Sequence, residues 1–200
     1  MPRIEAPTVA EHNVMRRRQV IAAAAEVLSD GGVATFTPAA VAKRAGLARS
    51  SMYQYYPSTD ALLGAAITEL LQRSRDRMVA AVAAADSPAE RITAYVRTAL
   101  SDATTGHGAT PDVSGMSMPE VCREGVRRLH DELLEPLRTA LSDAAVQDPG
   151  TVAVLVRGLI NAAASDVGHG TGSAAMADAT IDFVLRGVGL PHGPRVTDAV

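Results

Sequence analysis

The chain contains few of the residues that make covalent cross-links or aromatic sites. Its 200 residues include one cysteine, no tryptophan, four tyrosines and two phenylalanines. One cysteine cannot form an internal disulfide, which is typical of proteins from a reducing compartment. With 47% hydrophobic and 20% charged residues, the composition is that of an ordinary globular protein, and a chain of this length buries enough surface to fold without a metal. Intrinsic disorder is therefore excluded.

Long apolar runs are also missing. Apolar runs such as 20–25 and 152–156 end at charged residues and are far shorter than the ~20 residues that cross a bilayer. Residues 1–13 contain two acids and no apolar core, so they do not have the pattern of a secretory signal. We therefore expect a soluble protein of the cytoplasm.

Signatures of catalysis and of metal binding are absent from the sequence. It contains no HExxH, no GxSxG, no glycine-rich phosphate loop after a strand and no Cys/His set at zinc spacing. The scattered histidines form no triad pattern. The sequence thus favours a protein that is not an enzyme and has no cofactor or metal. An enzyme of another type and a helical adaptor that holds another protein stay open as alternatives.

Charge is distributed unevenly, although the net charge is only −3. Residues 1–60 carry seven basic and five acidic residues, which leaves the rest of the chain acidic. A basic end on an acidic body is expected when one end meets an anionic partner such as DNA.

Helical periodicity runs through almost the whole chain, and strand alternation is nearly absent. Gly31-Gly32 and Pro57 are stop signals, and the segment 87–90, SPAE, is a capping box. The expected helices are 13–29, 38–45, 49–55, 58–85, 87–103, 119–146 with a kink at Pro136, 151–167 and 174–188, and 103–118 is a loop with room for one helical turn. We expect an all-α fold of about nine helices. The expected domains are a helix-turn-helix domain at 13–57, a linking helix at 58–85, a larger helical domain at 86–190 and a flexible tail at 191–200.

The first three expected helices have the dimensions of a helix-turn-helix unit. Gly46 lies between the second and third, where the turn needs a positive φ. The segment 37–63, TPAAVAKRAGLARSSMYQYYPSTDALL, resembles the tetracycline-repressor (TetR) family of transcriptional regulators. This resemblance implies a homodimeric DNA-binding protein, most often a repressor that a small apolar ligand releases from a palindromic operator.

The third helix is expected to read DNA with one face. Leu47 and Met52 point inward, and Tyr55 or Tyr56 is expected in the core. Two positions differ from the family pattern: Ala48 replaces the usual Ser or Thr N-cap and Thr59 the usual Lys, which weakens the expected contact. The predicted DNA contacts are Arg16, Arg17, Arg18, Thr37, Arg44, Ala48, Arg49, Ser50, Ser51, Tyr53, Gln54, Tyr55, Tyr56 and Thr59.

The three consecutive arginines have two interpretations. The first helix could start earlier than residue 13, because Thr8 to Glu11 also has the pattern of a capping box. If Asn13 caps the helix instead, Arg16, Arg17 and Arg18 lie near its positive end, which is unfavourable and suggests a phosphate partner. A solvated helix face is the alternative.

The last two helices, 151–167 and 174–188, are unusually apolar. Small and aliphatic residues cover most of the circumference of the first, so an apolar side remains for a partner. The resemblance implies a four-helix interface between two subunits, and the alternative is the centre of a larger monomer core. The predicted interface residues are Val152, Leu155, Val156, Leu159, Ile160, Ala163, Ile181, Val184, Leu185 and Val188.

Few aromatics remain for a ligand site beyond residue 60. Only Tyr95 and Phe183 are found there, so an aromatic cage for a cation is not expected. We predict a pocket among helices 88–103, 119–146 and 151–167 for a neutral or weakly anionic apolar effector. An effector wedged between helix 58–85 and the helix after Pro119 would shift the former and alter DNA binding. The candidate pocket residues are Tyr95, Met116, Met118, Cys122, His130, Leu133 and Asn161.

Overall fold

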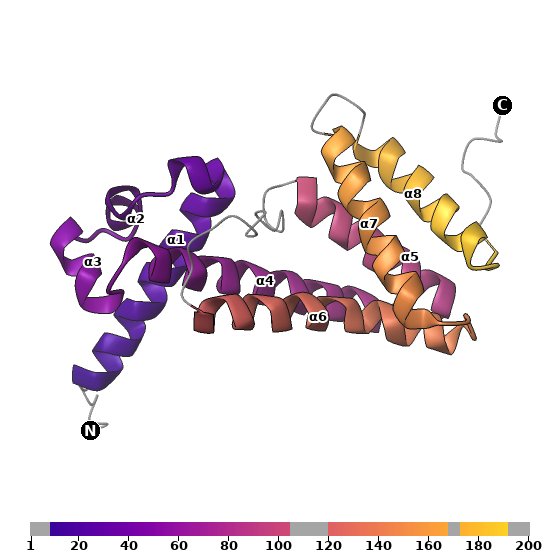
Figure 1. Cartoon of the computed structure of the whole chain (residues 1–200), viewed down its shortest axis with the longest axis horizontal. Coiled ribbons are helices and arrows are strands. Elements are labelled where there is room, and N and C mark those ends of the chain that lie inside the picture. Colours follow the sequence, from indigo (N-terminus) through magenta and orange to yellow (C-terminus); the bar gives the residue numbers. More distant parts are fainter. Residues whose placement is uncertain (1–8, 105–119, 168–172, 192–200) are drawn as a thin grey trace, which may run out of the picture. The chain divides into compact units, whose positions relative to one another are not determined.

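A computed structural model describes residues 9–104, 120–167 and 173–191, and every regular element in these residues is an α-helix (Figure 1). The helices are α1 (Val9–Thr35), α2 (Pro38–Arg44), α3 (Arg49–Tyr55), α4 (Thr59–Ala83), α5 (Pro88–Thr104), α6 (Glu120–Asp143), α7 (Pro149–Val167) and α8 (Ser173–Gly187). The predicted all-α fold is confirmed. The loop expected at 103–118 and the tail expected at 191–200 lie almost wholly outside the described residues.

Glycine and capping residues set the helix ends. In α1 the backbone leaves the helical conformation at Gly32, where φ is 65°, as the Gly31-Gly32 stop predicts. α5 begins with the predicted capping box: the Ser87 N–H donates to Glu90 Oε2 at 2.9 Å, and the Glu90 N–H donates to Ser87 Oγ at 3.2 Å. The hydrogen bond from the Ser87 backbone stabilises the carboxylate and lowers the pKa of Glu90.

Gly46 makes the turn between α2 and α3. Its φ is +65°, a left-handed conformation that glycine adopts without a Cβ clash. The Gly46 N–H donates to Lys43 O at 3.3 Å and the Leu47 N–H to Ala42 O at 2.9 Å, so α2 ends in a Schellman motif. The positive φ predicted for this turn is therefore confirmed.

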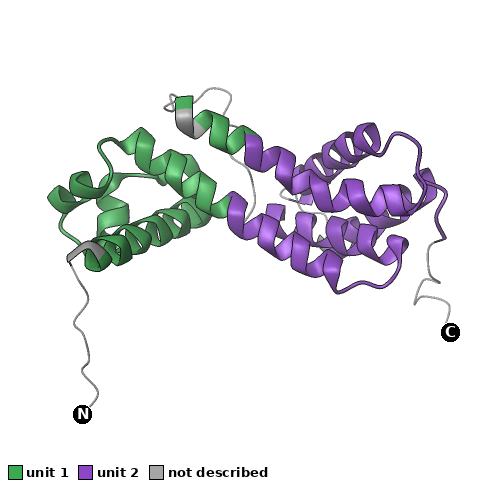
Figure 2. Cartoon of the chain, turned by 90° about the horizontal axis from the view of Figure 1, so that it is seen from below, with its two compact units in different colours: residues 1–70, 110–127 green, residues 71–109, 128–200 purple. Residues whose placement is uncertain are grey.

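Spatial contacts divide the chain into two compact units (Figure 2). The head unit consists of residues 1–70 and 110–127, and the body unit consists of residues 71–109 and 128–200. Helices α1 to α3 belong to the head unit and α5, α7 and α8 to the body unit, whereas α4 and α6 contribute residues to both. One boundary between the units therefore falls inside α4.

In the head unit, α1, α2 and α3 pack on one another. Val20 and Ala24 of α1, Val41 of α2 and Met52 of α3 are buried. These side chains come from all three helices, so they form the small core that fixes α3 against α1.

In the body unit, α5, α7 and α8 pack directly on one another, and α6 adds Leu137 and Leu141 to their core. A buried polar cluster attaches α4 to α5. Asp102 is 6% exposed and accepts hydrogen bonds from Ser74 Oγ at 2.6 Å and from Arg77 Nε at 2.9 Å. Because a buried carboxylate is costly without such partners, this cluster fixes the second half of α4 to α5.

Candidate DNA-binding face and regulatory groove

The recognition helix α3 presents a polar face to solvent. Met52 is 1% exposed and anchors the helix on the head core. The side chains predicted to share the outward face are all exposed: Ala48, Arg49, Ser50, Tyr53 and Gln54. Ser51 is partly buried beside them. A guanidinium, a hydroxyl, a phenol and an amide on one face are the groups that bind base edges and phosphates.

The two short head helices differ in their caps. Thr37 Oγ1 accepts a hydrogen bond from the Ala40 N–H at 3.1 Å and caps α2 as predicted. Ala48 at the start of α3 provides no side-chain cap, and the Ser51 N–H donates instead to the Ala48 backbone oxygen at 3.0 Å. The first turn of α3 thus leaves backbone N–H groups for solvent or for an anion.

The three consecutive arginines of α1 do not act together. α1 begins at Val9, so they lie beyond its first turn and the helix-end argument for a phosphate partner does not apply. Arg16 donates to Gln19 Oε1 at 3.1 Å. Arg17 lies over the Tyr56 ring, with its guanidinium carbon 5.1 Å from the ring centroid, and its Nε donates to the Tyr56 Oη at 3.4 Å. Arg18 is exposed.

A cleft of about 450 Å³ lies beside Arg17 in the head unit. It is lined by Asn13, Val14, Arg17, Gln54 and Tyr55. The lining joins the start of α1 to the end of α3 and combines one cation with two amide side chains. Among the described residues no carboxylate forms an ion pair with Arg17, so the cleft is a candidate site for an anion.

Arg44 is corrected from a DNA contact to a structural residue. Its NH1 donates to Glu26 at 3.0 Å and its NH2 to Asp30 at 2.7 Å, and hydrogen bonding to Asp30, then to Glu26, raises the pKa of Arg44. Both acids come from α1, so this arginine ties α2 to α1. The two carboxylates already neutralise its charge, which weakens its attraction for a phosphate.

Tyr56 is also corrected from a DNA contact. It is 5% exposed, and its hydroxyl accepts a hydrogen bond from Arg17. The sequence predicted that Tyr55 or Tyr56 lies in the core, and Tyr56 is that residue. Tyr55 is partly buried and lines the cleft. Thr59 is the first residue of α4 and half-buried, and the preceding Ser58 Oγ accepts from the Ala61 N–H at 3.1 Å.

The apolar surface of α7 and α8 is narrower than predicted. Leu155 is 66% exposed and Phe183 is 68% exposed, and Val152, Leu159 and Val188 lie at the edge of the same groove of about 510 Å³. The other predicted interface residues are buried in the body core: Val156, Ile160, Ala163, Ile181, Val184 and Leu185. Val156 and Val184 also line the groove. The other four are corrected to core residues, because they are buried among α5, α7 and α8 and do not line it.

α7 is also long and apolar enough, by length and composition alone, to cross a membrane. It contains Arg157 and Asp166 and packs on α5 and α8. Four of its residues belong to the body core: Ala153, Val156, Ile160 and Ala163. Its apolar side chains therefore include both core residues and exposed ones such as Val154 and Leu155.

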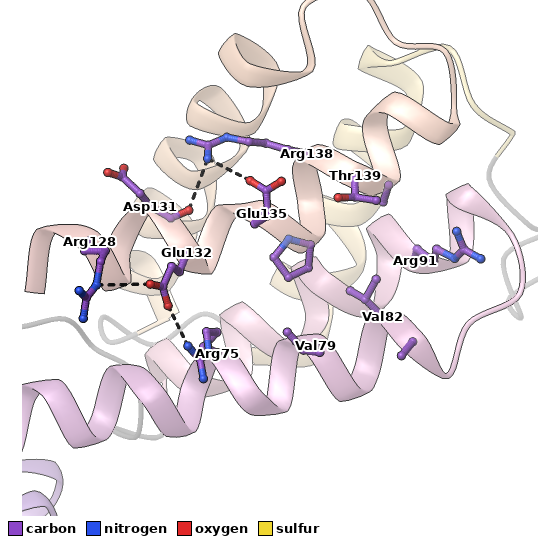
Figure 3. A pocket seen from close by; sticks show the side chains of 13 residues that line it. Arg75, Val79, Val82, Arg91, Arg128, Asp131, Glu132, Glu135, Arg138 and Thr139 are labelled. Atoms are coloured by element: carbon purple, nitrogen blue, oxygen red, sulfur yellow. Dashed lines mark hydrogen bonds and ion pairs between the residues drawn. The ribbon is translucent and has the colours of Figure 1, made fainter. Parts of the chain in front are cut away.

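A second groove, of about 710 Å³, lies between α4 and α6 in the body unit (Figure 3). Figure 3 shows Val79 and Val82 of α4 at the gap between the two helices. The lining residues are Arg75, Val79, Val82, Ala83, Arg91, Arg128, Asp131, Glu132, Glu135, Pro136, Arg138, Thr139 and Ala140. These two helices are the pair between which an effector was expected to be wedged.

The four candidate pocket residues that the structure describes, Tyr95, His130, Leu133 and Asn161, do not line this groove, and this is a correction. Tyr95 is 3% exposed, and its hydroxyl donates to Leu133 O at 3.1 Å. Leu133 packs against the body core, His130 is half-buried and Asn161 is exposed on α7. Met116, Met118 and the side chain of Cys122 lie outside the described residues. The facing sides of α5, α6 and α7 fill the core, so the open space lies on the other side of α6.

One ion pair joins the two helices at the groove, and two others lie within α6. Arg75 NH1 donates to Glu132 Oε2 at 2.8 Å, and Arg128 Nε lies 3.5 Å from Glu132 Oε1. The hydrogen bond with Glu132 is the main cause of the raised pKa of Arg75. Arg138 NH1 donates to Glu135 at 3.4 Å. Sequence analysis missed these residues, although Val79, Val82 and Ala83 at helical spacing are the signal of an apolar side on α4.

Three packed head helices with a positive-φ glycine before an exposed polar helix have the arrangement of a helix-turn-helix unit. Residues 20–66 match the sequence model of bacterial regulatory proteins of the tetR family. The head unit of the chain is therefore similar to the DNA-binding region of the TetR family.

Several known proteins are similar to the chain. The HTH-type transcriptional regulator BetI of Rhizobium meliloti (strain 1021) is 37% identical over 83 residues, which cover 42% of this chain and 41% of that protein. A TetR-like transcriptional regulator from Rhodococcus sp. RHA1 is 25% identical, with a TM-score of 0.62 and coverage of 92% and 98%. A regulator from Saccharomonospora viridis in complex with choline has a TM-score of 0.72, 18% identity and coverage of 86% and 96%, a likeness of fold alone.

The curated relatives match only part of their own length. The chain spans about two fifths of the length of the Rhizobium protein. The matched family region, 20–66, contains most of the head unit and none of the groove between α4 and α6. What the relatives bind through their other regions therefore cannot be assigned from this likeness.

Proposed function

We propose that the chain is a DNA-binding transcriptional regulator that acts as a homodimer in the cytoplasm, and that it is a repressor released from DNA by a small apolar ligand. The exposed face of α3 carries this proposal. It displays Arg49, Ser50 and Gln54 on a helix that Met52 holds in the head core. Base edges in the major groove are read by such groups on the second helix of a helix-turn-helix unit.

Arg17, Arg18 and Arg49 support DNA as the partner of the head unit. Among the described residues none of the three forms an ion pair with an acid. Cations left without carboxylate partners keep their attraction for phosphate, and each phosphate contact releases counterions and adds to affinity. Arg17 is the best placed of the α1 arginines, because Tyr56 holds its guanidinium beside the cleft that Gln54 of α3 also lines.

Leu155 and Phe183 support the homodimer. Two large apolar side chains, each about two-thirds exposed, border one groove on α7 and α8. An apolar surface of this kind on a soluble domain marks an interface, and a second copy covers it with the same surface in a two-fold arrangement. A two-fold dimer presents two recognition helices, so the operator is an inverted repeat.

The groove between α4 and α6 supports ligand control. Its volume of about 710 Å³ is within the range of small-molecule sites, which are typically ~300–1,000 Å³. α4 also contributes residues to the head unit, so a ligand against Arg75 or Val79 contacts a helix that the head shares. A ligand that weakens DNA binding is in turn weakened by DNA to the same degree.

The experiment is DNA selection followed by a salt titration. The full chain is incubated with random-sequence duplexes, the bound fraction is sequenced, and the affinity of the selected duplex is measured by fluorescence anisotropy at several salt concentrations. We expect an inverted repeat, two chains per duplex and an affinity that falls steeply with salt. A homodimer with no preference and no salt dependence would contradict the proposal and favour the protein-binding adaptor.

A further inference from the structure

We propose that the groove between α4 and α6 binds an aliphatic molecule with one anionic head group, and that this head group replaces Glu132 between Arg75 and Arg128. The inference rests on the proposed ligand control of the body unit. It adds the chemistry of the ligand and the ion pair through which the ligand acts.

The walls of the groove define the body of the ligand. Its apolar lining comes from aliphatic residues, namely Val79, Val82 and Ala83 of α4 with Pro136 and Ala140 of α6. Among the described lining residues none is aromatic. A quaternary ammonium ligand needs aromatic faces around its charge, and no ring is offered here. The lining therefore favours an aliphatic chain or ring system without such a cation.

The charges of the groove define the head group. Four arginines line the groove, and two of them also have partners outside the lining: Arg91 pairs with Asp143 at 2.9 Å and Arg75 with Asp76 at 3.0 Å. Arg128 shares Glu132 with Arg75, at 3.5 Å and 2.8 Å respectively, so Arg128 has the longer contact. An additional carboxylate at this place gives Arg128 a closer partner.

Arg128 is the residue most available to an incoming anion. Its side chain is 75% exposed, and its contact with Glu132 is long, at 3.5 Å. The shorter ion pair between Arg75 and Glu132 is also more than one-third exposed at both residues. Exposed ion pairs contribute little to stability, so a ligand carboxylate can compete with the Glu132 carboxylate for the same guanidiniums.

The exchange changes how α4 is attached to α6. Before ligand binding, Arg75 of α4 donates directly to Glu132 of α6. After the exchange, the two helices are joined through the ligand, whose aliphatic part lies against Val79 and Pro136. The other attachment of α4, from Ser74 and Arg77 to Asp102 of α5, is outside the groove and remains.

Three probes with the same aliphatic chain test the head-group chemistry. Decanoate, decanol and decyltrimethylammonium are titrated into the full chain by calorimetry at neutral pH, below their aggregation concentrations. We expect decanoate to bind at least about tenfold more tightly than each of the others. Equal binding of the three probes indicates non-specific uptake of amphiphiles and overturns the proposal, as does a preference for decyltrimethylammonium.

Variants of opposite effect test the exchange. Arg128→Gln removes the cation that donates hydrogen bonds to the head group, and we expect decanoate binding to weaken about tenfold. Glu132→Gln removes the competing carboxylate, and we expect decanoate binding to strengthen. Decanol binding should change with neither. Arg97→Gln is the matched control, because Arg97 pairs with Asp178 outside the groove. A general structural effect would shift both variants in the same direction, and that result would also overturn the proposal.

DNA is absent from these titrations, which separates the groove from the proposed function. If decanoate binds as expected but the chain has no affinity for any selected duplex, the groove assignment stands and the DNA-binding proposal fails. If DNA binds and the probe pattern is absent, the groove assignment alone fails. Circular dichroism spectra and thermal unfolding of each variant show that it is folded.

Discussion

In the head unit, Arg17, Arg18 and Arg49 have no carboxylate partner among the described residues, whereas seven arginines of the body unit form ion pairs with Asp or Glu. The residue type is the same in both units, and only its neighbours differ. A paired guanidinium cancels most of its field locally, while an unpaired one attracts anions across a Debye length of about 10 Å. The comparison shows that the arrangement of acids, more than the number of arginines, separates a DNA-binding surface from a structural one.

The largest expected effect is the dissociation of the proposed homodimer. Phe183→Glu places a charge on the exposed groove of α7 and α8, and burying it in a dimer costs several kcal/mol. We expect the dimer to dissociate with helical content unchanged, and DNA affinity to fall with it. Sedimentation velocity with circular dichroism checks this result. Asn161→Glu is the control, because Asn161 is exposed on α7 but does not line the groove.

A dimeric Phe183→Glu variant would contradict the assigned interface. Val184→Glu is a useful second variant, because Val184 is buried in the body core. We expect Val184→Glu to unfold the body unit and not merely to separate the subunits, because a carboxylate without a partner is costly to bury in an apolar core.

Replacing single arginines of the two units should change the free energy of unfolding by amounts that differ by about 2–3 kcal/mol. Arg77→Leu leaves the carboxylate of Asp102 in its buried position with Ser74 alone, and breaking a buried pair costs up to ~3–5 kcal/mol, reduced here because Arg77 is 41% exposed. Arg97→Leu breaks an exposed pair, for which the expected loss is below ~1 kcal/mol. Arg18→Leu breaks no pair in the described residues, and its effect should be near zero.

Urea denaturation of the three variants gives these unfolding free energies. If Arg77→Leu and Arg18→Leu lost equal amounts of unfolding free energy, ion pairing would not distinguish the body unit from the head unit.

The exposed face of α3 was predictable from the sequence, and the pairing of the arginines was not. A helix has a fixed period, so the inward position of Met52 also places Ser50 and Gln54, two residues away on either side, on the outside. The partners of Arg44 lie on another helix, 14 and 18 residues away, and no local pattern specifies that register. Arg77 and Asp102, 25 residues apart, are the same case.

The positions of the interface and of the groove could not be predicted from the sequence either, because both depend on tertiary packing. α7 is apolar around most of its circumference, so its sequence does not indicate which side faces α5; the structure buries Val156 and exposes Leu155. The groove exists because α4 and α6 are joined by side chains such as Arg75 and Glu132 and not by close packing along their length. The caps, in contrast, are local, and Ser87 and Glu90 form the predicted box.

The pH dependence of stability tests the body core. Burial raises the pKa of the Tyr95 phenol to about 12, above its value near 10 in the unfolded chain. The folded state therefore keeps a proton that the unfolded state loses, so this contribution is complete below pH 10 and is lost as the pH rises toward 12. The expected decrease in the unfolding free energy is about 2–3 kcal/mol. Tyr95→Phe should lack this decrease, and urea denaturation between pH 9 and 12 measures it. A wild-type slope equal to that of Tyr95→Phe would show that the phenol ionises freely in the folded state.

The α1 arginines test whether an unpaired cation in the head contacts phosphate. Arg17→Gln should weaken binding to the selected duplex about tenfold and reduce the salt slope by about one. Arg16→Gln is the matched control, because Arg16 is turned toward Gln19, and we expect its affinity to change less than about twofold. Anisotropy titrations at several salt concentrations measure both quantities. If both variants lowered DNA affinity equally, Arg17 would not make a specific phosphate contact, and the combined charge of the α1 arginines would explain the effect.

The smallest expected effect compares one turn from each unit. Gly46 in the head and Ala145 in the body both end a helix in a Schellman turn with positive φ, 65° and 54°, and the Val146 N–H donates to Leu141 O at 3.0 Å as Leu47 does to Ala42. A Cβ at Gly46 would meet nothing within 4 Å, so Gly46→Ala costs only the backbone conformation, about 1–2 kcal/mol.

Ala145→Gly removes that strain from the exposed body turn, but it also increases the entropy of the unfolded chain by about 0.4–1 kcal/mol. The strain term is the larger of the two, so the net result should be a stabilisation of about 0.5–1 kcal/mol. Urea denaturation of Gly46→Ala and of Ala145→Gly measures the two changes in unfolding free energy. We expect opposite signs, because the head turn has the residue that its φ favours and the body turn does not. Destabilisation by both changes would mean that Ala145 contributes packing that outweighs its backbone strain.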